Sequence, residues 1–97
     1  MAIDDEFFTF NIRYNRGADD FEVEGDLNKQ GQREVVEAFL SMQRGAGEDK
    51  RNPNKKDFYN ISLDWYPHYD KIKIRDDTGN KGLRDGILMR FLGYIGD

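Results

Sequence analysis

The residues best suited to bind a ligand lie in the segment Asp76-Asp77-Thr78-Gly79-Asn80-Lys81-Gly82. Glycines ahead of a helix leave backbone N–H groups free to bind an anion, and a lysine adds positive charge. The segment lacks the glycine and lysine spacing of a P-loop, and it lacks the alternating oxygen ligands and final glutamate of an EF-hand loop. Two adjacent aspartates would also repel phosphate. The sequence therefore favours a turn and helix cap, with anion binding through Lys81 as the alternative.

Few other side chains have the types and spacing that catalysis or metal binding requires. The chain has no cysteine and one histidine, His68, which excludes thiolate sites and multi-histidine metal centres. A catalytic or metal site could instead use one of three pairs of adjacent acids: Asp4-Asp5, Asp19-Asp20 and Asp76-Asp77. A pair of this kind can hold a hard cation or act as acid and base, but acids at strand ends are usually solvated turn residues. We therefore expect no catalytic residue, no metal and no cofactor, and a protein that is not an enzyme.

Hydrophobic periodicity predicts the elements that position these residues. Apolar and polar side chains alternate over residues 8–14, 21–24, 59–65 and 72–74, which is typical of half-buried strands. The period becomes that of an amphipathic helix over 28–43 and 81–94. Asp26 or Asn28 is the expected N-cap of the first helix, and Gly45 is its expected stop. Gly86 lies inside the second helix, where we expect a close approach by another element because glycine weakens a helix interior.

The two halves of the chain repeat this pattern with a nearly constant offset. A shift of 59 − 8 = 51 positions aligns Phe8 with Tyr59 and Phe10 with Ile61. We therefore expect a single domain, 1–97, built from two strand-strand-helix pseudo-repeats, 7–45 and 58–96, with a mobile loop over 44–57. The predicted fold class is α+β: a duplicated ββαββα chain forming a four-stranded antiparallel sheet with two helices on one face. The expected strand order is 1-2-4-3, that of a permuted ferredoxin-like sandwich.

The charges are distributed unevenly along the chain. Residues 1–43 carry 4 basic and 10 acidic side chains (4 − 10 = −6), whereas residues 44–97 carry 11 and 9 (11 − 9 = +2). The expected strand order would place the acidic second strand beside the basic fourth strand, so that Glu22 and Glu24 pair with Lys73 and Arg75. The exposed face of the sheet is expected to lack aromatic rings and to carry Thr9, Asn11, Arg13, Glu22, Glu24, Asn60, Ser62, Asp64, Lys73 and Arg75.

A face of this composition argues against a sheet that stacks nucleic-acid bases. Basic residues elsewhere could still contact phosphates, namely Lys50, Arg51, Lys55 and Lys56 of the loop together with Lys81. A nucleic-acid or nucleotide-binding domain that uses the loop 44–57 and the Gly79–Gly82 corner is therefore the alternative function.

Surplus apolar positions favour binding to a protein instead. The second helix already has a core stripe, so Met89 and Tyr94 widen its apolar surface beyond what the sheet needs. With Tyr66 and Tyr69 near the second turn, they form the expected partner-binding surface. The main hypothesis is a small soluble interaction module, such as an adaptor, inhibitor or assembly factor, that binds another protein or itself through the second helix. No targeting segment or membrane span is evident in this acidic chain, so a cytoplasmic location is expected.

Overall fold

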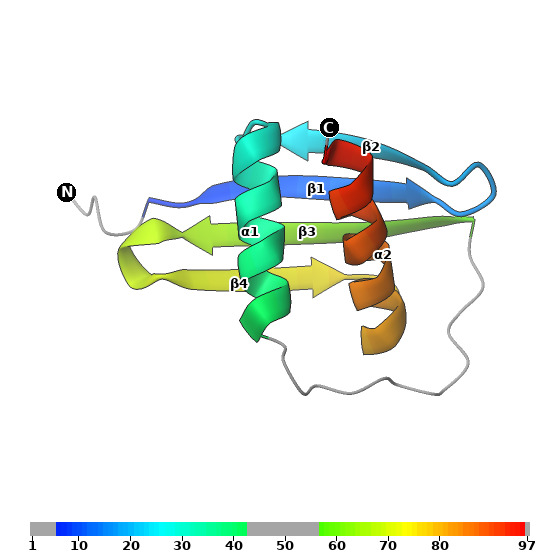
Figure 1. The fold of residues 1–97 in the computed structure, drawn as a ribbon. Coiled ribbons are helices and arrows are strands. Elements are labelled where there is room, and N and C mark those ends of the chain that lie inside the picture. Colours follow the sequence, from blue (N-terminus) through cyan, green and yellow to red (C-terminus); the bar gives the residue numbers. More distant parts are fainter. Residues whose placement is uncertain (1–5, 43–56, 97) are drawn as a thin grey trace.

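The computed structural model describes residues 6–42 and 57–96 of the chain (Figure 1). The elements in chain order are β1 (Phe8–Asn15), β2 (Asp20–Gly25), α1 (Lys29–Met42), β3 (Phe58–Tyr66), a 3₁₀ turn (Pro67–Tyr69), β4 (Lys71–Asp76) and α2 (Lys81–Ile95). The four strands form one antiparallel sheet, which with the two helices confirms the α+β class. The expected helix stop at Gly45 and the loop up to residue 56 lie outside the described residues.

The strands are arranged in the order β2-β1-β3-β4. This differs from the expected order 1-2-4-3, so the ferredoxin-like arrangement is not confirmed. The physical reason lies in the charges of the two outer strands. On one face, β2 carries three acids and β4 carries three bases: Asp20, Glu22, Glu24, Lys71, Lys73 and Arg75. Edge strands tolerate charged side chains and use them to discourage unwanted pairing, which leaves the less charged β1 and β3 at the centre.

The opposite charges of β2 and β4 do not meet in this arrangement. The expected pairing of Glu22 and Glu24 with Lys73 and Arg75 is wrong, because β1 and β3 lie between the two charged strands. Glu22 lies opposite Arg13 of β1 instead. The sheet therefore has one acidic edge and one basic edge.

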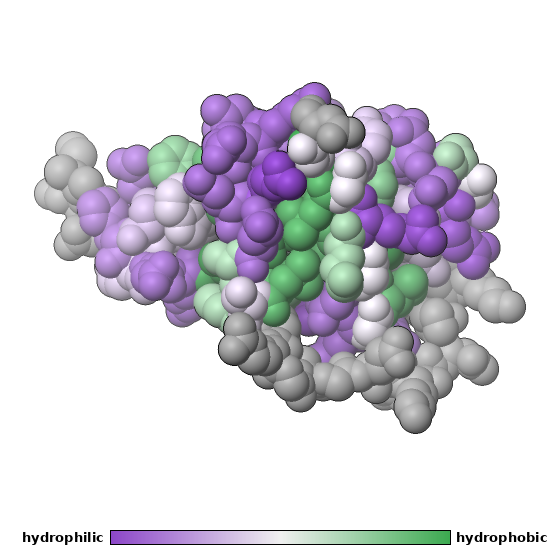
Figure 2. Space-filling model, in the orientation of Figure 1, coloured by the Kyte–Doolittle hydropathy of each residue, from purple (hydrophilic) through white to green (hydrophobic). Residues whose placement is uncertain are grey.

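Both helices lie on one face of the sheet and run across the strands rather than along them (Figure 1). Their apolar stripes and the apolar rows of the strands form one core, whose buried side chains are Phe10, Ile12, Tyr14, Phe21, Val35, Val36, Phe39, Tyr59, Ile61, Leu63, Ile87, Leu88, Phe91 and Ile95. Seen from the helix side, apolar residues gather in the strip between the two helices (Figure 2). Neither helix is long and apolar enough to span a membrane, a statement that covers the described part of the chain.

Asparagine caps begin both helices. The backbone N–H of Gly31 donates to Oδ1 of Asn28 over 2.8 Å, and the N–H of Leu83 donates to Oδ1 of Asn80 over 2.9 Å. Each bond satisfies a first-turn donor that has no partner within its helix, a contribution typically worth about 1 kcal/mol. Of the two caps expected for α1, Asn28 is therefore confirmed. The carboxylate of Asp26 instead accepts from the backbone N–H of Thr9 over 3.3 Å.

Two glycines have opposite surroundings. Gly25 has a φ of +155°, and a Cβ placed there would lie 2.4 Å from both the Cα of Phe10 and the carbonyl oxygen of Thr9. A Cβ placed at Gly86 would meet nothing within 4 Å. The close approach expected at Gly86 is therefore wrong, and Gly25 is the position where two backbones come too close for a side chain.

The order of the strands can be tested with two isoleucines. Ile61 in the central strand β3 is fully buried, whereas Ile74 in the edge strand β4 is half-buried. We expect Ile61→Ala to lower the free energy of unfolding by about 2–5 kcal/mol, as for large-to-small changes in a core. Ile74→Ala should cost clearly less, because part of its side chain is already in water. Urea titrations of both variants give the comparison, and equal losses would contradict an edge position for β4.

The two glycines provide a second test. Gly25→Ala should destabilise the fold severely, because the new methyl group would overlap the backbone of β1. Gly86→Ala should raise the free energy of unfolding by about 0.5–1 kcal/mol, since alanine favours a helix interior and space is available. Thermal unfolding followed by circular dichroism measures both. A stable Gly25→Ala protein would show that the β1–β2 register is wrong.

Candidate functional site

Polar groups of the Asp76–Gly82 corner form hydrogen bonds with one another and with the adjoining strand and helix. The hydroxyl of the buried Thr78 donates to Oδ2 of Asp76, and the backbone N–H of Thr78 donates to the same oxygen over 3.3 Å. Asn80 caps α2, as described above. Lys81 is exposed at the first residue of α2. These contacts give the corner the turn and capping role that the sequence favours, and nothing in them tests the alternative of anion binding.

The acid pairs serve local structure. Asp19 has a left-handed backbone with φ of 52° and accepts hydrogen bonds from the Tyr14 hydroxyl at 2.8 Å and from Nη1 of Arg90 at 3.1 Å. Asp77 accepts from the backbone N–H of Asn60 over 2.8 Å. Over residues 6–42 and 57–96, no three acidic or histidine side chains come together to hold a metal ion. The pair Asp4-Asp5 lies outside the described residues.

The Asp19 contact changes the chemistry of Tyr14. Burial raises the pKa of Tyr14 above its ordinary value of 10.0, and the hydrogen bond to Asp19 and its negative charge raise this pKa further. The positive charges of Arg90 and Arg16 oppose part of the increase. The cluster therefore holds Tyr14 neutral and ties the β1–β2 turn to α2.

The four residues expected to bind a partner lie in two separate places. Met89 and Tyr94 are on α2, where their side chains are 65% and 53% exposed. The Tyr94 ring also packs against Phe21 of β2, with ring centroids 5.1 Å apart. Tyr66 ends β3 and Tyr69 ends the 3₁₀ turn, at the opposite end of the sheet from α2 (Figure 1). The structure therefore brings Tyr66 and Tyr69 together but separates them from Met89 and Tyr94.

Tyr66 and Tyr69 line a surface hollow with two lysines. This tyrosine–lysine hollow has a volume of about 250 Å³ and is lined by Tyr66, Tyr69, Lys71 and Lys73. It opens on the face of the sheet opposite the helices, which we call the open face. The Phe7 ring stacks on Tyr66 with centroids 4.9 Å apart, and Nζ of Lys73 lies 5.3 Å from the centre of the Tyr66 ring. Tyr66 is thus held in place on one side by Phe7, which directly precedes β1, and on the other by Lys73 of β4.

The expectation that the open face lacks aromatic rings is wrong. Phe7, Tyr66 and Phe58 all lie there, and the guanidinium carbon of Arg13 lies 4.3 Å from the centre of the Phe58 ring. The reason is that β3 extends beyond the expected residues 59–65 at both ends, from Phe58 to Tyr66. The alternation that places Trp65 on the helix face places its neighbour Tyr66 on the open face. Continuing the period by one residue at each end would have identified both rings from the sequence.

The lysines of the hollow have no carboxylate partner among the described residues. Arg75 does have one, because its Nη2 donates to Oδ1 of Asp64 over 3.1 Å. Asp64 is buried and also accepts from the hydroxyl of Thr9 over 2.6 Å. The centre of the open face is therefore a satisfied polar network. Lys71 and Lys73 remain available to an external negative charge.

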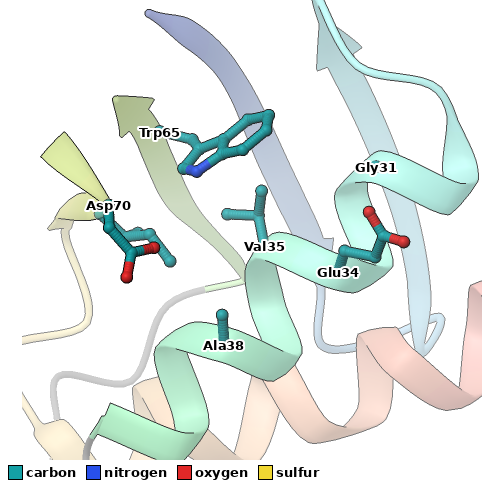
Figure 3. Close-up of a pocket in the computed structure, with 7 residues that line it drawn as sticks. Gly31, Glu34, Val35, Ala38, Trp65 and Asp70 are labelled. Carbon is teal, nitrogen blue, oxygen red and sulfur yellow. The ribbon is translucent and has the colours of Figure 1, made fainter. Parts of the chain in front are cut away.

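A second hollow lies on the other side of β4, between that strand and α1. It has a volume of about 210 Å³, and Figure 3 shows the side chains around it. Trp65, Val35 and Ile72 supply apolar surface, while Glu34 and Asp70 supply negative charge. We call it the α1-side hollow, and its remaining lining residues are Gly31 and Ala38. No sequence pattern predicts it, because alternation places Ile72 and Trp65 on the helix face without showing how far α1 covers them.

Arg84 is a buried charged residue on α2 that no sequence motif marks. It is 7% exposed, its Nε donates to Oδ1 of Asp85 over 2.9 Å, and its guanidinium lies 5.1 Å from the centre of the Phe39 ring. Its Nη2 atom is buried and has no hydrogen-bond partner among residues 6–42 and 57–96. The signal was helical spacing, because Arg84 lies three, four and seven residues before the buried Ile87, Leu88 and Phe91.

Of the basic residues proposed for nucleic-acid binding, Lys50, Arg51, Lys55 and Lys56 lie outside the described residues. Lys81 begins α2 beyond the end of β4, whereas Lys71 and Lys73 begin β4, so the corner and the tyrosine–lysine hollow lie at different ends of that strand.

The two hollows beside β4 differ in the chemistry of their lining residues. One combines exposed aromatic surface with two lysines, and the other combines apolar surface with two acids. The chain matches no protein-family model, no curated protein and no solved structure.

The hydrogen bond between Tyr14 and Asp19 can be tested by measuring the free energy of unfolding as a function of pH. Tyr14→Phe keeps the ring but removes the hydrogen bond to Asp19, which should cost about 0.5–1.5 kcal/mol near neutral pH. Because the folded protein holds the Tyr14 proton more tightly than the unfolded chain does, this contribution is present below pH 10.0 and is lost as pH rises through the raised pKa. Urea titrations from about pH 7 to 11 should show a shallower alkaline decline in the variant.

The control for this test is Tyr69→Phe. Its side chain is 57% exposed, so its loss of stability near neutral pH should stay within about 0.5 kcal/mol. An alkaline decline in Tyr14→Phe as steep as in the wild type would show that Tyr14 does not contribute to it.

Proposed function

We propose that this chain is a non-enzymatic interaction module that binds an acidic surface of another protein through the tyrosine–lysine hollow. The observation that supports it most directly is the hollow itself, in which Tyr66 and Tyr69 lie beside two lysines that have no described carboxylate partner. The non-enzymatic part rests on the sequence, which has no cysteine and a single histidine. An adaptor, an inhibitor and an assembly factor all fit this description.

The residue types of the hollow favour a protein partner. Tyrosine supplies a large contact area at a low cost in conformational entropy, and it is enriched among the residues that dominate binding energy. Tyr66 is already fixed by Phe7 and Lys73, so less ordering is needed when a partner binds. Lysines at the rim of such a contact mainly increase the association rate and select partners of opposite charge.

Nucleic acid is the second candidate, because Lys71, Lys73 and the exposed Tyr69 could contact phosphates and a base. Two features make it the weaker one. Phe7 and Lys73 already contact the Tyr66 ring, so a base that stacked on Tyr66 would have to displace one of them. The acidic side chains of the edge strand β2 point to the same open face and would repel a phosphate backbone that extended across the sheet.

Met89 and Tyr94 of α2 remain proposed as a second contact surface. Both side chains are more than half exposed. Because they lie far from the hollow, a single small partner would not cover both places, and self-association through α2 would leave the hollow open.

We also propose that the two halves are copies of one strand-strand-helix unit. The registers of the two hairpins support this, because Phe10 pairs with Gly25 and Ile61 pairs with Asp76, at offsets of 61 − 10 = 51 and 76 − 25 = 51. Asn11 and Ser62 are also 51 positions apart, and they lie directly opposite each other on β1 and β3 and share a hydrogen bond. The two proposed copies therefore meet at equivalent residues.

The proposed function predicts which charges matter for capture of a partner. Lys71→Glu, Lys73→Glu reverses the hollow, while Lys29→Glu, Lys81→Glu makes the same change of charge at the exposed first residues of the two helices. Purified proteins are immobilised and exposed to nuclease-treated lysate of the source cells, and captured proteins are quantified by mass spectrometry. We expect the wild type and the helix variant to enrich the same acidic protein, and the hollow variant to lose at least about tenfold, as 1.4 kcal/mol would cause.

Equal enrichment by all three proteins, or none, would contradict the proposal. A fluorescent random single-stranded oligonucleotide distinguishes the second candidate. Steeply salt-dependent binding that the hollow variant loses would assign the hollow to nucleic acid. Circular dichroism confirms that each variant is folded.

A further inference from the structure

The edge strand β4 lies between the two hollows. Its partner on one side is β3, and no other described strand pairs with it on the outer side. An edge strand presents a row of backbone N–H and C=O groups that another extended chain can bind. The tyrosine–lysine hollow lies on the open face of this strand, and the α1-side hollow lies on its helix face.

We infer that β4 binds an extended segment of its partner as a fifth strand, with acidic side chains on the open face and apolar side chains on the helix face. This inference rests on the proposed function and adds the chemistry of the partner. Main-chain hydrogen bonds provide affinity in this mode of recognition, and pockets for alternate side chains provide specificity. The edge of β4 offers both.

The open face determines the acidic half of the pattern. Lys71, Lys73 and Arg75 occupy every second position of β4, so they point to the same face with the spacing of a strand. Side chains directly opposite each other on neighbouring strands lie about 4.5–5.5 Å apart at Cβ, within reach of an ion pair. Arg75 already binds Asp64, so the acids opposite Lys71 and Lys73 carry most of the selectivity.

The helix face determines the apolar half. Ile72 is half-buried and forms part of the α1-side hollow with Trp65 and Val35, so a neighbouring apolar side chain would remove this surface from water (Figure 3). Glu34 and Asp70 on the same hollow would repel an acid placed there. A shift of the added strand by one residue exchanges its two faces, so these two carboxylates help to fix the register.

The same charges and side chains exclude β2 as the edge that binds the acidic segment, and they exclude the strands of a second copy as the occupant of the β4 edge. The edge of β2 carries Asp20, Glu22 and Glu24 and would repel an acidic segment. Two copies of β4 would place lysines against lysines. The β2 strand of a second copy has matching acids, but its Phe21 is buried in its own core and cannot enter the α1-side hollow. An acidic and apolar segment of a different protein is therefore the occupant that uses both hollows.

The probe is an eight-residue peptide with blocked ends in which glutamate and valine alternate. Two matched controls have the same composition: one groups the glutamates before the valines, and the other carries N-methyl groups on alternate backbone amides. Binding to the isotope-labelled full chain is followed by amide chemical shifts, and hydrogen exchange is measured at saturation. We expect saturable binding at or below about 1 mM and at least tenfold slower exchange at every second amide of β4. Both controls should bind at least tenfold more weakly, because the grouped sequence breaks the two-faced pattern and N-methylation removes backbone donors.

The outcomes separate this inference from the proposed function. Binding that depends on Lys71 and Lys73 but tolerates N-methylation overturns strand addition and leaves the acidic-surface contact standing. Equal binding of the grouped peptide overturns the alternating pattern. No binding by the wild type overturns the inference, while the proposed function is decided by the lysate capture described above. A concentration-dependent dimer that occupies β4 without peptide identifies a second copy as the occupant and also overturns it.

Discussion

The antiparallel pairing of β1 with β3 is the constraint on which the rest of the structure depends. It sets Phe10 opposite Leu63 and Ile12 opposite Ile61, so the apolar rows of both strands lie on one face. Two helices are then needed on that face to remove those rows from water, and each has an apolar stripe of the required period. The polar residues between these positions are forced onto the open face, where Asp64 and Asn11 accept hydrogen bonds from neighbouring hydroxyls.

The central pair also determines which strands form the edges of the sheet. Once β1 and β3 occupy the middle, the two charged strands become edges, and no other described strand pairs with the outer side of either. Of the two, β4 adjoins a cavity on each face. The α1-side hollow exists because α1 crosses the sheet without covering the end of β3 that holds Trp65 (Figure 1). The tyrosine–lysine hollow is formed instead by side chains of β3, β4 and the 3₁₀ turn between them.

The sequence predicted the local structure well and the long-range arrangement poorly. Alternation identified all four strands, and residue types that act over a few positions gave two N-cap candidates for α1, of which Asn28 is the cap, and a helix over 81–94 that matches α2 to within one residue. The strand order did not follow, because both 1-2-4-3 and β2-β1-β3-β4 place one strand between β2 and β3 and bury the same faces. The tyrosine–lysine hollow was not predicted: Tyr66 and Tyr69 were expected to share one partner-binding surface with Met89 and Tyr94, and the stacking of Phe7 on Tyr66 depends on the β1–β3 pairing.

The segregation of charge to opposite edges gives the molecule an electric dipole along the sheet, independent of its net charge of −4. Neighbouring strands lie about 4.8 Å apart, so three spacings separate β2 from β4 by about 14 Å. That exceeds the Debye length of about 8 Å at physiological ionic strength but is shorter than the value of about 30 Å at 0.01 M salt. In a cell, an acidic molecule approaching β4 is therefore attracted by the near edge while the far edge is screened. In dilute buffer it also senses the acidic edge, so its association rate need not increase as salt is removed.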